Sequence, residues 1–232
     1  MLIRKQTPLT KNNKGLGGFQ VLGDPHPWPR DDKTPISKCA VIVIDTQHDY
    51  CSSGFYMDKA GYDIGRLSKI IEPIKQVLVV ARYNGMKIIY TRYGRPIEPE
   101  PKTNLESTVI STFPQTAAYG EEGWQIVPEL IPDKKDKVID KVTCSAFISG
   151  ELNKYLHEHN IKHLVFCGNT IDVCVHSTLR SAVDLNYESL LLEDCCGAVN
   201  NGLHQWAIES IKIENGVFGT VSDSQTFINA LS

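Results

Sequence analysis

The chain has 232 residues, a length that fits one or two domains. Hydrophobic residues make up 41% of it, aromatic residues 8% and charged residues 22%, which are ordinary globular values and exclude a wholly disordered, collagen-like or coiled-coil protein. With 24 Lys and Arg against 27 Asp and Glu, the net charge of −3 provides no bulk positive field, so we expect no nucleic-acid partner.

Residues 1–38 are predicted to form an N-terminal arm that precedes a single domain at residues 39–232. The arm is polar and rich in Gly, Pro and Lys. Its segment DPHPWP at 24–29 cannot be helical, because each proline disfavours the α conformation in the residue before it. We expect the arm to wrap around its own domain or a partner subunit; a partly disordered tail over residues 1–20 is an open alternative.

From residue 39 onward, short β-branched apolar runs alternate with segments of helical period. The runs predict strands at 40–44, 87–90, 137–139, 163–167, 189–192 and 217–221. Most are apolar throughout, which is typical of parallel strands covered on both faces. Helices are predicted over 64–81, 150–158, 172–185, 203–213 and after 222, with Pro73 expected to kink or divide the first. This alternation predicts βαβ units and an α/β fold with a parallel sheet.

The seven cysteines do not form a regular disulfide frame, and no pair has C-x-x-C spacing. Reduced thiols fit a cytoplasmic protein, and the first 19 residues lack the apolar core of a secretion signal. No apolar stretch is long enough to cross a membrane, so no membrane partner is expected. The vicinal pair Cys195-Cys196 follows a predicted strand, where a redox role and simple burial are both open.

Three reactive residues follow predicted strands, at the edge where ligands of α/β sheets bind. They are Asp45, Lys141 and Cys174. Cys174 is expected in the first turn of a helix, where unpaired N–H groups favour a thiolate and can hold an oxyanion. A nucleophile, a base and a third charged group fit covalent catalysis, with Asp45 as base. Taken singly, the three could instead be a cap, a solvated lysine and a small buried hydrophobe.

The segments VIDTQ (43–47), IDK (139–141) and GNTIDVCVHSTLRSA (168–182) resemble the isochorismatase-like hydrolase superfamily, in its cysteine-dependent amidohydrolase branch. The resemblance covers residues 39–232. It implies a three-layer, Rossmann-like fold with a six-stranded parallel sheet flanked by helices, often assembled as homo-tetramers. It also implies a catalytic triad of Asp45, Lys141 and Cys174. A cis peptide is implied at Asn169–Thr170, with an oxyanion hole formed by the N–H groups of Thr170 and Cys174.

The resemblance also bears on metals and on the reaction. Nicotinamidases of this superfamily carry an Asp-x-His metal motif after the second strand, where this chain reads TRYGR at 91–95. The only Asp-x-His is Asp24-Pro25-His26 in the arm, so no metal and no other cofactor are expected. Members that cleave isochorismate lack the cysteine, so Cys174 argues against vinyl-ether hydrolysis.

Further segments are similar to the ureide hydrolases, first to biuret hydrolases and next to ureidoacrylate amidohydrolases. They are DPHPWP (24–29), GFYMDKAGYD (54–63), EEGWQIVPEL (121–130), LLLEDCCGA (190–198) and GVFGTVSDS (216–224). This likeness implies substrate binding by Tyr50, Cys144 and Glu214. Biuret hydrolases carry a lysine at the position of Cys144 and a glutamine at that of Glu214, so the match is incomplete there. Packing or solvated roles are open for all three.

Together these features predict a cysteine-dependent amidohydrolase that cleaves a C–N bond of a small, biuret-like ureide or amide through a thioester and releases ammonia. Ureidoacrylate, an N-carbamoyl amine or a nicotinamide-like ring are alternative substrates. A non-catalytic binding module of the same superfamily is an alternative of another class. The filled triad positions argue against it, because a scaffold has no need of them.

Overall fold

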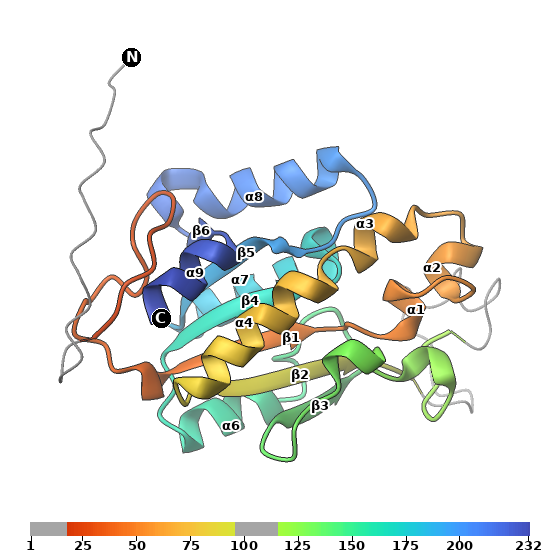
Figure 1. The fold of residues 1–232 in the computed structure, drawn as a ribbon, viewed down its shortest axis with the longest axis horizontal. Helices are drawn as coiled ribbons and strands as arrows, with labels where there is room; N and C mark the ends of the chain where they lie inside the picture. Colours follow the sequence, from red (N-terminus) through yellow and green to blue (C-terminus); the bar gives the residue numbers. More distant parts are fainter. Residues whose placement is uncertain (1–17, 96–115) are drawn as a thin grey trace.

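The computed structural model describes residues 18–95 and 116–232. Six strands form one all-parallel sheet in the order β3-β2-β1-β4-β5-β6 (Figure 1). They are β1 (Cys39–Ile44), β2 (Lys87–Tyr93), β3 (Lys137–Lys141), β4 (His163–Gly168), β5 (Glu188–Cys196) and β6 (Thr220–Ser222). The predicted α/β fold with a six-stranded parallel sheet is confirmed. All six carboxyl ends therefore point to the same edge.

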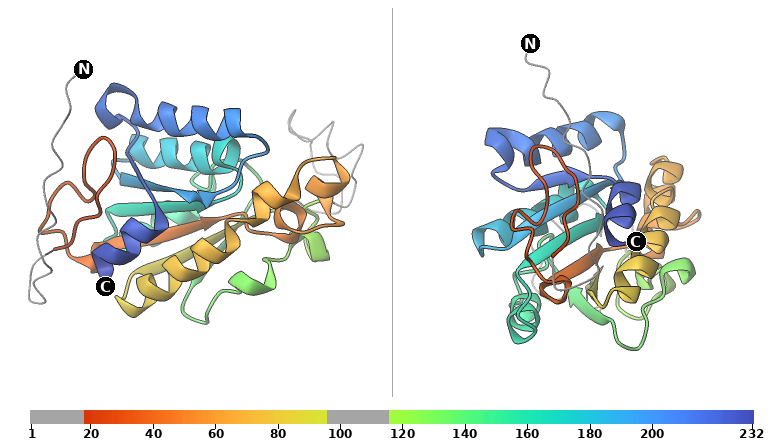
Figure 2. Two further views of the ribbon diagram at one scale, coloured as in Figure 1. Left: turned by 45° about the horizontal axis from the view of Figure 1, so that its top comes forward. Right: turned by 60° about the vertical axis from the view of Figure 1, so that its left-hand side comes forward.

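Helices cover both faces of this sheet, as Figures 1 and 2 show. One face carries α4 (Ile71–Tyr83) and α9 (Ser224–Leu231). The other carries α6 (Glu151–Glu158), α7 (His176–Asp184) and α8 (Asn201–Gly216). Shorter elements are α1 (His48–Cys51), α2 (Tyr56–Lys59), α3 (Ile64–Ser68), the 3₁₀ turns η1 (Ile36–Lys38), η2 (Glu122–Trp124) and η3 (Pro128–Leu130), and the π-helical turn η4 (Ile171–Val175). None of the described helices combines the length and apolarity that crossing a bilayer requires.

Alternate side chains of β1 pack into the hydrophobic cores on the two faces of the sheet. Ala40, Ile42 and Ile44 pack into the core beneath α6, α7 and α8. Val41 and Val43, whose side chains alternate with these, pack into the core beneath α4 and α9. All five are fully buried, so no position of this strand can be polar.

Two predicted elements have different bounds in the structure. The helical segment 64–81 is two helices, α3 and α4, and Pro73 is the third residue of α4. A proline is tolerated there because the first-turn N–H groups have no intrahelical partner. The last strand begins at Thr220, three positions after the predicted start, because the chain turns at Gly219 with φ +139°.

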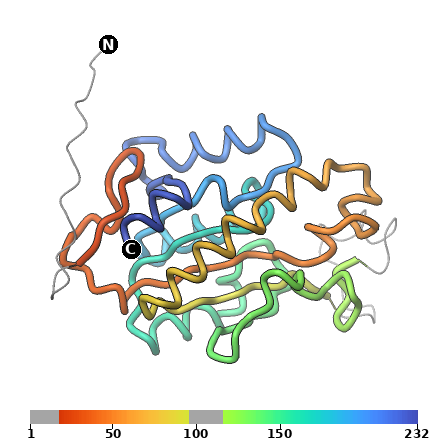
Figure 3. The backbone as a smooth tube through the Cα atoms, in the orientation of Figure 1, coloured from red at the N-terminus to blue at the C-terminus, as the bar shows by residue number. Residues whose placement is uncertain are grey.

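The arm packs on its own domain over residues 18–38, beside the C-terminal segment (Figure 3). Asp24 and Val221 exchange two backbone hydrogen bonds of 2.9 Å, which extend the sheet at β6. Trp28 is fully buried in the core and meets the ring of His163 edge-on. The expected tail over residues 1–20 lies mostly outside the described residues, as does part of the long connection after β2.

The Asp-x-His motif of the arm is used for packing. The carboxylate of Asp24 lies 3.1 Å from Nζ of Lys212. The ring of His26 contacts the hydroxyl of Thr220 at 2.7 Å and the guanidinium of Arg30 at 2.7 Å. These contacts hold the arm at the amino-terminal edge of the sheet, away from the strand ends that carry the candidate site.

Candidate active site

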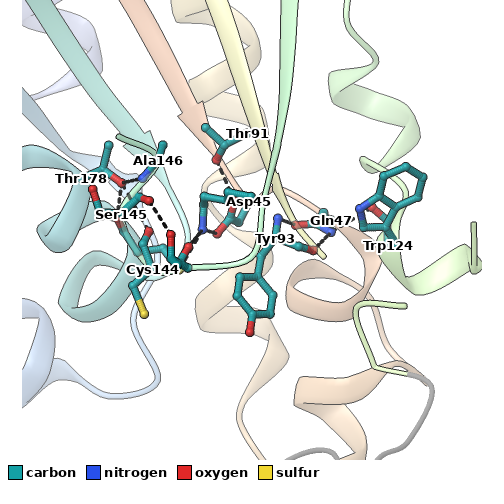
Figure 4. Close-up of polar contacts among 12 residues, drawn as sticks. Asp45, Gln47, Thr91, Tyr93, Trp124, Cys144, Ser145, Ala146 and Thr178 are labelled. Carbon is teal, nitrogen blue, oxygen red and sulfur yellow. Dashed lines mark hydrogen bonds and ion pairs between the residues drawn. The ribbon is translucent and has the colours of Figure 1, made fainter. Parts of the chain in front are cut away.

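Asp45 directly follows β1, and Thr91 of β2 holds it through both its backbone and its side chain. The N–H of Asp45 donates to the carbonyl of Thr91 at 3.1 Å. The hydroxyl of Thr91 donates to Oδ1 of Asp45 at 2.7 Å (Figure 4). Asp45 has φ 49°, a left-handed conformation that aspartate tolerates better than most residues. The carboxylate is therefore fixed in a buried position at the carboxyl edge of the sheet.

Lys141 is the last residue of β3, and its ammonium has three acceptors for its three hydrogens. Nζ lies 2.7 Å from Oδ2 of Asp45, 3.0 Å from the carbonyl of Thr143 and 3.4 Å from Sγ of Cys174. The side chains of Lys141 and Asp45 are only 2% and 1% exposed. Burial alone would lower the pKa of Lys141, but the charges of Asp45 and Cys174 outweigh it and raise this pKa above its usual value. Lys141 is therefore a cation.

Cys174 is placed by a tight turn after β4. At the end of this strand, Gly168 has φ +120°, and a Cβ there would lie 2.0 Å from the carbonyl oxygen of Ile44. Only glycine allows β4 to approach β1 so closely. The Asn169–Thr170 peptide bond is cis, and the carbonyl of Thr170 accepts the N–H groups of Val173 and Val175, both at 3.1 Å. This turn, η4, brings Cys174 back over the strand ends.

The thiols of Cys174 and Cys144 influence each other strongly. The contact with Cys144, then burial and the charge of Asp45, raise the pKa of Cys174 well above its usual value, against the attraction of Lys141. Cys144 is only half-buried, and its hydrogen bond to Cys174 and the charge of Lys141 outweigh burial and lower its pKa to about 6. Of these two thiols, Cys144 is therefore the one whose pKa the surroundings lower.

Two tyrosines lie next to the cluster formed by Asp45, Lys141, Cys144 and Cys174. Burial, with the charges of Cys174 and Asp45, raises the pKa of Tyr50 well above its usual value. The ring of Tyr50 meets that of Tyr56 edge-on at 6.4 Å. Tyr93 places its ring 5.1 Å from Nζ of Lys141, a contact that the sequence did not predict. The cluster therefore has an aromatic border around a charged centre.

Comparison with known proteins identifies the family of this chain. The model of the isochorismatase domain matches residues 39–226. The chain belongs to the isochorismatase family. This membership confirms the superfamily resemblance of the three motif segments.

Relatives of known name lie within this family. The chain is 38% identical over 201 residues to the ureidoacrylate amidohydrolase RutB of Caulobacter segnis, covering 81% of this chain and 82% of that protein. It is 37% identical over 206 residues to the RutB of Cronobacter sakazakii, covering 83% and 88%.

Solved structures of the family share the fold. A cysteine hydrolase from Pseudomonas syringae pv. phaseolicola 1448A has a TM-score of 0.77 at 22% identity, covering 91% of this chain and 96% of that one. The N-carbamoylsarcosine amidase from Thermoplasma acidophilum has a TM-score of 0.65 at 22% identity, covering 81% and 96%.

Glu214 does not join the cluster of this isochorismatase-family chain. It is exposed near the end of α8, two residues before Gly216, which contacts His26 and Pro25 of the arm. Since α8 runs back across the sheet, its last turn lies at the amino-terminal edge, opposite to Asp45 (Figure 1). Within this chain, Glu214 is therefore corrected from a pocket residue to a surface residue beside the arm.

Polar side chains that the sequence did not single out hold the surrounding loops. The Nε2 of Gln47 donates to the carbonyls of Tyr93 at 2.8 Å and Trp124 at 2.9 Å, and its Oε1 accepts the N–H of Tyr93 (Figure 4). The hydroxyl oxygen of Thr178 lies 2.7 Å from the carbonyl of Cys174 and 3.5 Å from that of Cys144. Only the position of Gln47, two residues after Asp45, marked it in the sequence.

His176 is turned away from Cys174. Its ring stacks on that of Trp206 at 5.3 Å and accepts a hydrogen bond from Nε of Arg180 at 3.1 Å. Burial and the charge of Arg180 lower the pKa of His176 to about 4, so the ring is neutral at neutral pH. The base nearest to the thiol is therefore Asp45.

The coupling between Asp45 and Lys141 can be measured with a double-mutant cycle. Lys141→Met leaves the buried carboxylate of Asp45 unpaired and should lower the free energy of unfolding by about 3–5 kcal/mol, whereas the double variant Asp45→Asn/Lys141→Met should recover most of this. Urea unfolding measures both. Lys137→Met, which breaks the half-exposed pair with Glu151, is the matched control and should cost about 1 kcal/mol or less. Equal losses in Lys141→Met and the double variant would contradict the strong coupling.

The two thiols predict an order of alkylation. At pH 7, iodoacetamide should modify Cys144 before Cys174, because Cys144 is half-buried and ionises at about 6. Its rate should rise with pH through that value, while labelling of Cys174 should need a higher pH. Peptide mapping over a time course measures both rates. The five buried cysteines are internal controls that react only in urea, and faster labelling of Cys174 would contradict the assignment.

Proposed function

We propose that this chain is a cysteine-dependent amidohydrolase of small ureides or amides, with Cys174 as nucleophile, Asp45 as base and Lys141 as their charge partner. One observation carries the proposal: a single buried ammonium contacts both the carboxylate of Asp45 and the sulfur of Cys174. This is the arrangement that an activated nucleophile needs. Relatives at 37–38% identity named ureidoacrylate amidohydrolase support it.

The first half of the reaction transfers the thiol proton of Cys174 to Asp45. As the sulfur attacks the substrate carbonyl, its proton passes to Asp45 and an S–C bond forms. The carbonyl oxygen becomes an oxyanion, which the N–H groups of Thr170 and Cys174 are proposed to bind. Neutralising Asp45 leaves the charge of Lys141 free to stabilise the new negative charge, so the net charge of the site is unchanged.

The second half restores the enzyme. The tetrahedral adduct collapses, its C–N bond breaks, and Asp45 returns the proton to the leaving nitrogen, which departs as ammonia. The remaining thioester is attacked by a water that gives its proton to Asp45. The S–C bond then breaks and the sulfur regains a proton, so one amide and one water become one acid and one ammonia.

Among ureides, ureidoacrylate and biuret are the leading substrates, and they make different demands. Ureidoacrylate carries a carboxylate that needs N–H or cationic partners, whereas biuret is neutral. The names of the relatives favour the first, and the sequence likeness favours the second. Because Glu214 lies outside the cluster of this chain, it gives biuret no support. Tyr50 and Cys144, which border the cluster, are the proposed substrate-binding side chains.

A homo-tetramer in the cytoplasm is the proposed setting. The seven free cysteines support a reducing compartment. Exposed Trp206, Ile213 and Val217 on and beside α8 support an apolar contact between subunits. Sedimentation of the purified chain would test the assembly.

A screen of ammonia release over biuret, triuret, ureidoacrylate, N-carbamoylsarcosine and nicotinamide tests the activity. We expect turnover of a ureide, and Cys174→Ser should lower it by at least about a thousandfold, as loss of a nucleophile does in other hydrolases. Cys39→Ser, in the core at the far end of β1, is the matched control and should keep the wild-type rate. Undiminished ammonia release by Cys174→Ser would refute the proposal.

Thr91 is expected to act as a positioning residue. Thr91→Val removes the hydrogen bond to Asp45 without changing the size of the side chain, and kcat should fall roughly tenfold, the effect of a barrier about 1.4 kcal/mol higher. Thr91→Ser keeps the hydroxyl and should restore kcat. A kcat of Thr91→Val equal to that of the wild type would contradict this role.

A further inference from the structure

We propose that Cys144 and Cys174 form a reversible disulfide on reaction with hydrogen peroxide, which makes the pair a redox modification site that switches the nucleophile off. The effect on activity rests on the proposed function of Cys174, whereas formation of the disulfide does not.

The backbone places these two cysteines side by side. Cys144 lies in the loop after β3 and Cys174 in the turn after β4, and the single hydroxyl of Thr178 lies within 3.5 Å of both of their carbonyls. Thr178 also accepts the N–H of Ala146 at 3.2 Å, which fastens the loop to α7 (Figure 4). Nζ of Lys141 lies 3.4 Å from Sγ of Cys174 and 3.0 Å from the carbonyl of Thr143, the residue before Cys144. The two cysteines therefore lie on neighbouring segments that are held against each other, as a disulfide between them requires.

The other cysteines are poor candidates. Cys144 and Cys174 are partly exposed, while the remaining five are buried. Cys195 and Cys196 are adjacent in β5, but their side chains point into the cores on opposite faces of the sheet. Burial raises the pKa of each of them well above its usual value. Neighbours in sequence thus cannot pair, whereas two distant cysteines can.

The chemistry begins at Cys144, which is partly exposed and ionises readily beside Lys141. Its thiolate attacks peroxide, the O–O bond breaks, and the hydroxide that leaves takes up the proton that the Cys144 thiol had lost, so that a sulfenic acid and one water form. Cys174 then attacks the sulfenic sulfur, its proton passes through Asp45 to the departing hydroxyl, and a second water leaves as the S–S bond forms. In sum, two thiols and one peroxide give one disulfide and two waters.

The disulfide changes both Cys174 and Lys141. The sulfur of Cys174 can no longer attack a carbonyl, and the ammonium of Lys141 loses a polar partner for one of its hydrogens. A dithiol reductant restores the site by thiol–disulfide exchange.

The test uses the full-length chain treated with hydrogen peroxide and then with N-ethylmaleimide to block the remaining thiols. Peptide mapping without reduction should show one linked pair, Cys144 with Cys174, in the wild type and in Cys39→Ala. Ammonia release should fall in proportion to the linked fraction and return with dithiothreitol. Cys144→Ser should form no linked peptide. Any fall in its ammonia release after peroxide, measured against the untreated variant, should occur without a disulfide.

The outcomes separate the two proposals. If peroxide leaves Cys144 and Cys174 unlinked, as free thiols or sulfinic acids, the switch is refuted. A linked pair that dithiothreitol cannot open also refutes it. If the pair links and ammonia release is undiminished, the modification site stands and the proposed role of Cys174 fails.

Discussion

The site depends on the buried ion pair between Asp45 and Lys141. The two residues leave β1 and β3, which are not neighbours, since β2 lies between them. Taking both charges out of water costs several kcal/mol per ion, and an apolar pair of similar size is often equally stable. The pair is thus poorly explained by stability alone. The proposed chemistry explains it, because the pair places a carboxylate and an ammonium beside the sulfur of Cys174.

The parallel sheet makes this arrangement possible. Its strands end at one edge, so side chains far apart in sequence meet there without long loops. The remaining fit is local: Gly168 lets β4 approach β1, Thr91 orients the carboxylate, and Thr178 ties the turn of Cys174 to the loop of Cys144. Each of these contacts involves backbone atoms or short side chains, which hold the charged centre rigid.

The parallel α/β fold was accessible from strand periodicity. The meeting of Asp45, Lys141 and Cys174 was accessible from the rule that ligands bind beyond strand ends. The strand order and the register were not, since periodicity does not say which strands pair. Glu214 was misplaced because its position just before the last strand does not tell which edge of the sheet it lies on. The hydrogen bond from Thr91 to Asp45 could not be predicted, because threonine is a common strand residue.

The central claim is that the sulfur of Cys174 bonds to the substrate carbon while Asp45 accepts the thiol proton and Lys141 balances the charge. Rapid quenching with acid during turnover of the ureide found active, followed by intact-mass and peptide analysis, tests this most directly. The account predicts a transient acyl adduct on the peptide that contains Cys174, accumulating before ammonia release reaches its steady rate. An adduct on Cys144 instead, or steady turnover with no adduct on any cysteine, would contradict it.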